Sequence, residues 1–198
     1  MRKPVFALDV DGVLLDIVPG AVAYVKKKYG VTIKHEHVTD WDWDYSWSLT
    51  EGLTNEFWEH VWNTPAQMHD GALEFITGLT LEGFEPVLVS TRPNNFKGMG
   101  DIARQAAFRD FPQLGVERIE LVEHNKDKVD VLQRYNSLYM LEDNPINAAM
   151  CHKKSGVLSY LITRPWNERC ICFNSEWTRV WSYNTVLRLV RDHQAIRQ

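Results

Sequence analysis

Two aspartates near the N-terminus are placed where they could do chemistry together. Asp9 and Asp11 follow the apolar run 5–8, and Gly12 comes directly after them. Side chains alternate along a strand, so both carboxylates should point to the same side while Val10 points into the fold. Two acids at the end of a buried strand repel each other and lose hydration, a cost that a divalent cation offsets. The spacing indicates a divalent-metal site with a nucleophile; the alternative interpretation is an ordinary acidic turn.

A pair of hydroxyl residues stands at the end of a second apolar run. Ser90 and Thr91 follow the run 86–89, and Arg92 comes next. In open α/β sheets, ligands bind at the carboxyl ends of the strands, where hydroxyls and backbone N–H groups can hold a phosphate oxygen. The pair therefore indicates an anion site, although turn and capping chemistry explains it equally well when it is taken alone.

A lysine and a second acid pair complete the set of candidate groups. Lys128 begins a helical pattern, the end at which the helix dipole disfavours a cation, so we expect a counter-anion beside it, such as a phosphate or the acid pair. Lys126 competes for the same role. Glu142 and Asp143 follow the apolar run 138–141. The Asn-Pro pair after them explains helix initiation, but it does not explain the two acids.

The elements that must position these residues alternate along the chain. Short apolar runs are separated by helical patterns, which predicts an α/β fold with a parallel sheet flanked by helices. The expected strands contain residues 5–8, 86–89, 118–122, 138–141 and 157–162. A first helix, which Gly30 ends, follows the first strand, and a C-terminal helix carries Val186, Leu189 and Val190.

The segment 35–62 differs from the rest of the chain. It holds five of the eight tryptophans and no lysine or arginine, and Thr54 is the expected N-cap of a short helix. We interpret 17–65 as a small helical cap inserted after the first strand, with 1–16 and 66–198 as the core domain. The cap aromatics form a small core or present flat faces to a planar ligand. The candidates for substrate contact are Trp43, Trp47, Phe57, Trp58 and Arg92.

Length, charge and cysteine usage exclude several classes of protein. A chain of 198 residues with 44% hydrophobic residues suits one domain, with or without a small insert. The net charge of −4 gives no general attraction to nucleic acid or to an anionic membrane. No apolar run approaches the roughly 20 residues of a membrane span, and the N-terminal run is no signal peptide. Three cysteines are too few for a disulfide framework, so we expect cytosolic thiols and a cytoplasmic protein.

Taken together, the strand-end residues resemble the four motifs of the haloacid dehalogenase superfamily of phosphohydrolases, in type, order and context. Within that superfamily the chain is most similar to the 5′(3′)-deoxyribonucleotidase family. The shared features are the Asp-x-Asp-Gly-Val opening, the small aromatic cap and the Thr-Arg-Pro-Trp-Asn motif at 163–167. The chain departs from that family in having Glu142 before Asp143 instead of two aspartates. It also has Ser-Thr-Arg-Pro instead of Thr-Ser-Pro, so Ser90 or Thr91 takes the role of the second motif.

The resemblance implies a Rossmann-like parallel sheet with helices on both faces and a small helical cap after the first strand. It also implies Mg²⁺-dependent hydrolysis of a phosphomonoester, with Asp9 as the nucleophile and Asp11 as the general acid and base. In this interpretation Asp9, the backbone carbonyl of Asp11 and Asp143, with help from Glu142, hold the Mg²⁺. The transferring phosphoryl group is neutralised by Lys128 together with the hydroxyls of the second motif.

Three hypotheses for the substrate and the activity stay open from the sequence. The first is a nucleotidase for small (deoxy)nucleoside monophosphates, with cap aromatics stacking on the base. The second is a phosphatase for another phosphate, such as a sugar phosphate or a polynucleotide 3′-phosphate; an acidic cap disfavours a long polyanion. The third is a phosphate-binding module without catalysis, which the joint presence of Asp9, Asp11, Lys128 and Asp143 disfavours. No membrane partner is expected, and a homodimer is compatible with the sequence.

Overall fold

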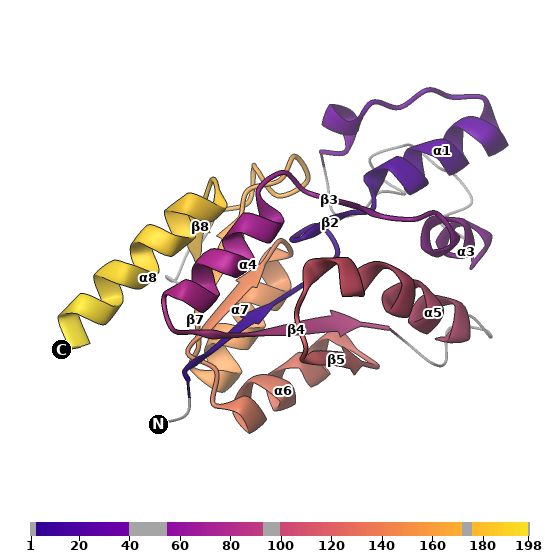
Figure 1. The fold of residues 1–198 in the computed structure, drawn as a ribbon. Helices are drawn as coiled ribbons and strands as arrows, with labels where there is room; N and C mark the ends of the chain where they lie inside the picture. The colour runs from indigo at the N-terminus through magenta and orange to yellow at the C-terminus, as the bar shows by residue number, and fades with distance from the viewer. Residues whose placement is uncertain (1–2, 40–54, 93–99, 172–175, 198) are drawn as a thin grey trace.

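One parallel sheet of six strands forms the centre of the protein in the computed structural model, which describes residues 3–39, 55–92, 100–171 and 176–197 (Figure 1). The strand order is β5-β4-β1-β6-β7-β8, and every neighbouring pair is parallel. The strands are β1 (Val5–Leu8), β4 (Glu85–Thr91), β5 (Ile119–Val122), β6 (Tyr139–Glu142), β7 (Leu158–Ile162) and β8 (Thr178–Val180). The five predicted strands are all present, and the short edge strand β8 is additional.

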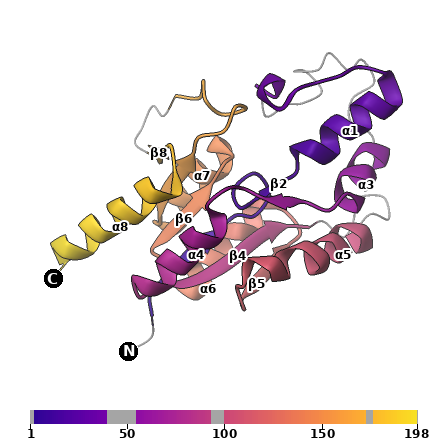
Figure 2. The ribbon, with the colours of Figure 1, turned by 45° about the horizontal axis from the view of Figure 1, so that its top comes forward.

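Helices cover both faces of the sheet, as predicted. One face carries α4 (Ala72–Leu81), α5 (Gly100–Asp110) and α8 (Tyr183–Arg197), and the other carries α6 (Lys128–Tyr135) and α7 (Pro145–Ser155). Figure 2 shows α4 beside α8 on their face of the sheet. Alternate residues of β1 supply the two cores, because Phe6 and Leu8 pack against the first set of helices while Val5 and Ala7 pack against the second.

A short two-stranded ribbon connects the sheet domain to a separate helical body. The ribbon pairs β2 (Leu15–Asp16) with β3 (Gln67–Met68) in antiparallel fashion. Between them in the chain lie α1 (Val18–Tyr29), a short 3-10 helix η1 (His35–His37) and α3 (Asn55–Asn63). Figure 1 shows α1 and α3 together, away from the main sheet. This is the predicted small helical cap after the first strand, and we propose 17–65 as its extent because the ribbon strands flank that segment.

The cap has a hydrophobic cluster of its own, built mainly from α1 and α3. The predicted end of the first helix is confirmed, because Gly30 follows α1 with a φ of 69° in the left-handed region. Phe57 is a member of this cluster with no exposed surface, and its ring packs edge-on against Tyr24, with the ring centres 5.4 Å apart. We therefore treat Phe57 as a core residue of the cap and no longer as a candidate for ligand contact. Trp43, Trp47 and the predicted N-cap Thr54 lie outside the described residues.

In the ranges that the structure describes, none of the helices combines the length and the apolar composition that crossing a bilayer requires.

The burial of Phe57 leads to a prediction about stability. Phe57→Ala removes a fully buried ring from the cap cluster, so the free energy of unfolding should fall by about 3–5 kcal/mol. Phe108→Ala on α5 is the matched control, because that ring is 69% exposed and its loss should change the stability by no more than about 0.5 kcal/mol. Urea denaturation followed by tryptophan fluorescence measures both. Equal stabilities for the two variants would show that Phe57 is not part of the cap core.

Candidate active site

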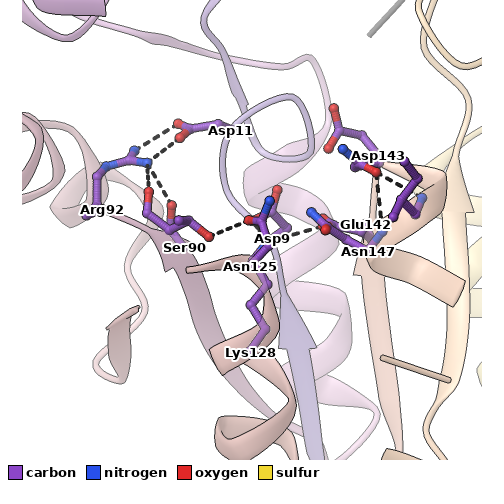
Figure 3. A network of polar contacts seen from close by, with 12 residues as sticks. Asp9, Asp11, Ser90, Arg92, Asn125, Lys128, Glu142, Asp143 and Asn147 are labelled. Atoms are coloured by element: carbon purple, nitrogen blue, oxygen red, sulfur yellow. Dashed lines mark hydrogen bonds and ion pairs between the residues drawn. The ribbon is translucent and has the colours of Figure 1, made fainter. Parts of the chain in front are cut away.

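The predicted residues of four distant segments meet at the carboxyl edge of the central strands. Because β1 is parallel to β4 and β6, residues that follow β1 lie between the ends of those two strands. Leu8 is level with Leu141, and the backbone N–H of Asp9 donates to the carbonyl of Leu141 at 3.0 Å, so Asp9 lies beside Glu142. Figure 3 shows Asp9 at the centre, with Arg92 and Ser90 to one side and Glu142 and Asp143 to the other.

Lys128 has the acidic counter-ions that its place at the start of a helix led us to expect. Its Nζ donates to Asp9 Oδ1 at 2.6 Å and to Glu142 Oε1 at 3.1 Å, and only 2% of its surface is exposed. Burial opposes the charge of Lys128, but the neighbouring Asp9 and Glu142 raise its pKa above the usual value. Lys128 is therefore a buried ammonium between two carboxylates. Lys126, which competed for this role in the sequence, is exposed.

Three buried carboxylates surround one point beside Lys128. One oxygen each from Asp9, Glu142 and Asp143 lies within 4.8 Å of the others. Burial, followed by the charge of Glu142, raises the pKa of Asp9 well above its usual value. Burial also raises the pKa of Glu142, and burial together with the charge of Asp9 raises that of Asp143 from 3.8 to about 8. One lysine does not balance three buried acids, so the site favours protons or a cation.

Two oxygen atoms of this cluster have no hydrogen-bond partner among the described residues. They are Oε2 of Glu142 and Oδ1 of Asp143, and both are buried. Buried acceptors are normally paired, so each such atom calls for an explanation. The cluster offers three hard oxygen donors and carries an excess of negative charge, and two of its acceptors are unpaired among the described residues. This set of ligands suits Mg²⁺. The residues therefore fit the metal that the sequence resemblance implies.

Asp11 has different partners from Asp9. Both terminal nitrogens of Arg92 donate to the Asp11 carboxylate, the second of them at 3.0 Å. The strand β1 ends at Leu8, and Gly12 has a φ of 76°, so the alternation of side chains along a strand does not extend through this turn. Only Asp9 of this pair belongs to the carboxylate cluster. The predicted pair is therefore divided: Asp9 belongs to the carboxylate cluster, whereas Asp11 is bound by Arg92.

The two hydroxyl residues also differ in their surroundings. Ser90 is buried, and its Oγ accepts from Nη1 of Arg92 at 2.9 Å. Thr91 is half-buried, and its Oγ1 donates to Oδ1 of Asn125 at 2.6 Å, in the 3-10 helix η3 (Asn125–Asp127). Ser90 therefore contacts Arg92, the partner of Asp11, whereas Thr91 contacts η3, which precedes α6.

Three further aromatic residues lie at this site, and none of them was assigned a contact there from the sequence. Trp62 on α3 has its ring centre 6.0 Å from the Arg92 guanidinium carbon, and Phe111 lies at 5.1 Å from the same carbon. Trp166 donates its indole N–H to Oδ2 of Asp143 at 2.8 Å. A signal for Trp62 was present, since it lies four residues after Trp58 on one helix face. Nothing in the sequence linked Trp166 to Asp143.

The chain is similar to known proteins in structure rather than in sequence. No protein-family model matches the sequence, and no curated protein sequence gives a significant match. Among solved structures, a protein described as a haloacid dehalogenase-like hydrolase from Burkholderia xenovorans is similar, with a TM-score of 0.64 and 14% sequence identity over 97% of this chain and 98% of that one.

Two other solved structures are similar over nearly the whole chain. A protein described as a phosphoglycolate phosphatase from Haemophilus somnus has a TM-score of 0.58 at 12% identity, and covers 96% of this chain and 99% of its own. A protein described as a β-phosphoglucomutase from Thermotoga maritima has a TM-score of 0.57 at 14% identity, with coverages of 96% and 99%. The chain therefore has the Rossmann-like α/β fold of haloacid dehalogenase-like hydrolases, as the sequence predicted.

The raised pKa of Asp143 predicts the sign of a pH effect on stability. Between about pH 4 and about pH 8 the folded protein holds a proton at Asp143 that the unfolded chain has released, so without divalent metal the stability contributed by this group falls as the pH rises. Asp143→Asn should flatten the dependence and be the more stable form above pH 8. Urea denaturation in EDTA from pH 5 to pH 8.5 tests this.

The exposed Asp101 on α5 provides the control for this experiment. Asp101→Asn should retain the pH dependence of the wild type. The opposite result would be a wild type that gains stability relative to Asp143→Asn as the pH rises. The proton would then bind preferentially to the unfolded chain, and the raised pKa of Asp143 would be wrong.

Proposed function

We propose that this protein is a Mg²⁺-dependent phosphomonoester hydrolase of the haloacid dehalogenase superfamily. The buried group of Asp9, Glu142 and Asp143 around Lys128, at the carboxyl edge of a parallel sheet, is the observation that carries the proposal. The fold shared with haloacid dehalogenase-like hydrolases supports it, and two of the similar structures have names that refer to phosphate compounds.

Asp9 and Asp143, with support from Glu142 and the main-chain carbonyl of Asp11, would hold the Mg²⁺. When bound, the ion would supply positive charge to the phosphate oxygens and reduce the repulsion between that phosphate and the carboxylates. The two acids of the second pair differ in their protein partners. Oε1 of Glu142 accepts from the ammonium of Lys128, whereas Oδ2 of Asp143 accepts from the neutral indole N–H of Trp166, and each acid keeps one buried oxygen without a partner among the described residues. Because the lysine charge already compensates Glu142, we assign Asp143 as a direct ligand and Glu142 a supporting role.

The chain's own residues would perform the two displacement steps. A carboxylate oxygen of Asp9 attacks phosphorus as the bond from phosphorus to the ester oxygen breaks, and the leaving oxygen takes a proton from Asp11. Water then attacks the aspartyl-phosphate, Asp11 takes the proton of that water, and Asp9 is released together with inorganic phosphate. Lys128 orients Asp9 through its Oδ1 and stabilises the charge of the transferring group.

Arg92 must change its partner for the acid step. Its guanidinium holds both oxygens of Asp11, so Asp11 can serve as a proton donor only when this pair opens. A substrate phosphate offers Arg92 another anion with suitable bidentate geometry. The hydroxyl of Ser90, already bonded to Arg92, lies where it would contact the same phosphate. Arg92 is thus a substrate-binding residue that also releases Asp11.

We propose a (deoxy)nucleoside monophosphate as the substrate. The support is aromatic: the rings of Trp58 and Trp62 lie 5.6 Å apart on α3, both half-buried, and Trp62 is beside Arg92. A base that stacks on Trp62 would place its phosphate near Arg92. Trp43 and Trp47 remain candidates from the sequence. The runner-up is another small phosphate, such as a sugar phosphate, which needs no stacking platform.

The nucleophile can be tested with a conservative replacement. Asp9→Asn keeps the size of the side chain but removes its charge, so turnover of p-nitrophenyl phosphate should fall by roughly three or more orders of magnitude. EDTA should abolish wild-type turnover, and added Mg²⁺ should restore it. The exposed Asp101→Asn serves as the control and should retain wild-type rates. Near-normal turnover by Asp9→Asn would remove the proposed mechanism.

The stacking role of Trp62 can be separated from a structural role by the choice of substrate. Trp62→Ala should lower kcat/KM for nucleoside monophosphates by about 5- to 150-fold, the equivalent of about 1–3 kcal/mol for one stacked base. Hydrolysis of ribose 5-phosphate, which lacks a base, should change by no more than about twofold. Trp181→Ala is the control, since that ring is 66% exposed and belongs to the sheet domain. An equal loss on both substrates would make Trp62 a structural residue of the cap and would remove the aromatic support for a nucleotide substrate.

A further inference from the structure

The Thr-Arg-Pro-Trp-Asn motif at 163–167 follows β7 and returns to the carboxylate cluster. Trp166 is buried, with 3% of its surface exposed, and its indole Nε1 donates to Oδ2 of Asp143 at 2.8 Å. The other carboxylate oxygen, Oδ1, has no hydrogen-bond partner among the residues described. The two oxygens of Asp143 are therefore unequal: one is bound by the protein, and the other is left for a ligand.

The indole ring has little freedom to move away from Asp143. It belongs to the hydrophobic cluster of the cap, together with residues of α1 and α3. A Cβ atom at Gly12 would lie 2.1 Å from Oδ2 of Asp143 and 3.0 Å from Cζ2 of Trp166. The turn after β1, the carboxylate and the indole are thus in close contact, and only glycine leaves room for them. Rotation of the carboxylate is restricted on that side.

The neighbours of Trp166 in the motif hold the backbone around the same carboxylate. Asn167 is fully buried, and its Nδ2 donates to the main-chain carbonyl of Asp143 at 2.7 Å. Arg164 donates from Nε to the carbonyl of Gly12 at 2.6 Å and from Nη2 to that of Val13 at 2.8 Å. The motif therefore fixes both the strand end that carries Asp143 and the turn that carries Asp11.

We propose that Trp166 is a positioning residue that makes Asp143 a one-oxygen metal ligand. By engaging Oδ2, the indole N–H directs Oδ1 to the cation and prevents the carboxylate from rotating to chelate with both oxygens. This inference rests on the metal site of the proposed function. Outer-shell donors of this kind hold a ligand in one orientation, and their removal typically reduces metal affinity by 10- to 100-fold.

Trp166→Phe tests the inference because it keeps a buried aromatic ring and removes only the N–H donor. In the substrate-free protein, the Kd for Mn²⁺, followed by the electron paramagnetic resonance signal of free Mn²⁺, should rise about 10- to 100-fold. The Mg²⁺ concentration for half-maximal phosphatase activity should rise in parallel, while kcat at saturating Mg²⁺ changes much less. Equal Mn²⁺ affinities for the variant and the wild type would overturn the inference.

Trp177→Phe is the matched control. This tryptophan is also buried, at 9% exposed, but its ring packs against Arg179 at 5.3 Å in a different cluster. Its replacement should leave the Mn²⁺ affinity unchanged. A double variant completes the test: in an Asp143→Ala background, Trp166→Phe should cause no further loss of affinity, because the oxygen that it orients is gone. A further loss of the same size would assign Trp166 a structural role.

The wild-type protein provides a readout that does not depend on a variant folding. Addition of Mg²⁺ should shift the indole N–H resonance of Trp166 in the ¹⁵N-labelled protein and leave that of Trp177 in place. A Trp166 resonance unmoved at saturating Mg²⁺ would overturn the inference. A wild-type protein that binds neither Mn²⁺ nor Mg²⁺ would overturn the proposed metal site as well. Metal binding that is equally tight without the indole N–H would refute only the role of Trp166.

Discussion

The burial of three carboxylates around a single ammonium group is the constraint on which the rest of this site depends. Charges removed from water are costly, and one lysine compensates only part of the charge on Asp9, Glu142 and Asp143. The chain keeps these groups buried nevertheless, and two of their oxygens have no hydrogen-bond partner within the described residues. An arrangement of this kind is unfavourable for folding alone, and a positively charged ligand such as the proposed Mg²⁺ would offset its cost.

The parallel sheet explains how residues so far apart in sequence reach one position. β1 lies between β4 and β6, so a single edge receives an acid pair from each of two strands and a hydroxyl pair from a third. The start of α6 adds Lys128 beneath Asp9. Within each acid pair the partners differ: Asp9 and Glu142 share Lys128, Asp11 is bound by Arg92, and Asp143 by Trp166. Carboxylates of the same kind are therefore placed in different surroundings by their neighbours.

The framework of this site was predictable from the sequence, whereas most of the pairings between its side chains were not. The strand ends were predictable because apolar runs locate buried strands, and parallel strands present their carboxyl ends at one edge. Strands of two or three residues, such as β2, β3 and β8, give no periodic signal. The ion pair of Asp11 with Arg92 spans 81 positions, and the contact of Trp166 with Asp143 depends on where a loop returns. The aromatic pattern of the cap placed Phe57 on an apolar face, but such a face cannot distinguish a core ring from a ligand platform.

The cap contacts the candidate active site through two aromatic residues. One belongs to the cap and the other to the sheet domain. Trp62 belongs to α3 and lies beside Arg92, the partner of Asp11. Trp166 belongs to the sheet domain, yet its ring packs in the cap cluster while its N–H binds Asp143. Arg109 on α5 adds a third connection, since it donates to the carbonyls of Trp62 and Thr64 at the end of α3. A displacement of the cap would thus alter the surroundings of Asp11 and Asp143 together, so the packing that holds the cap also sets the geometry of both acids.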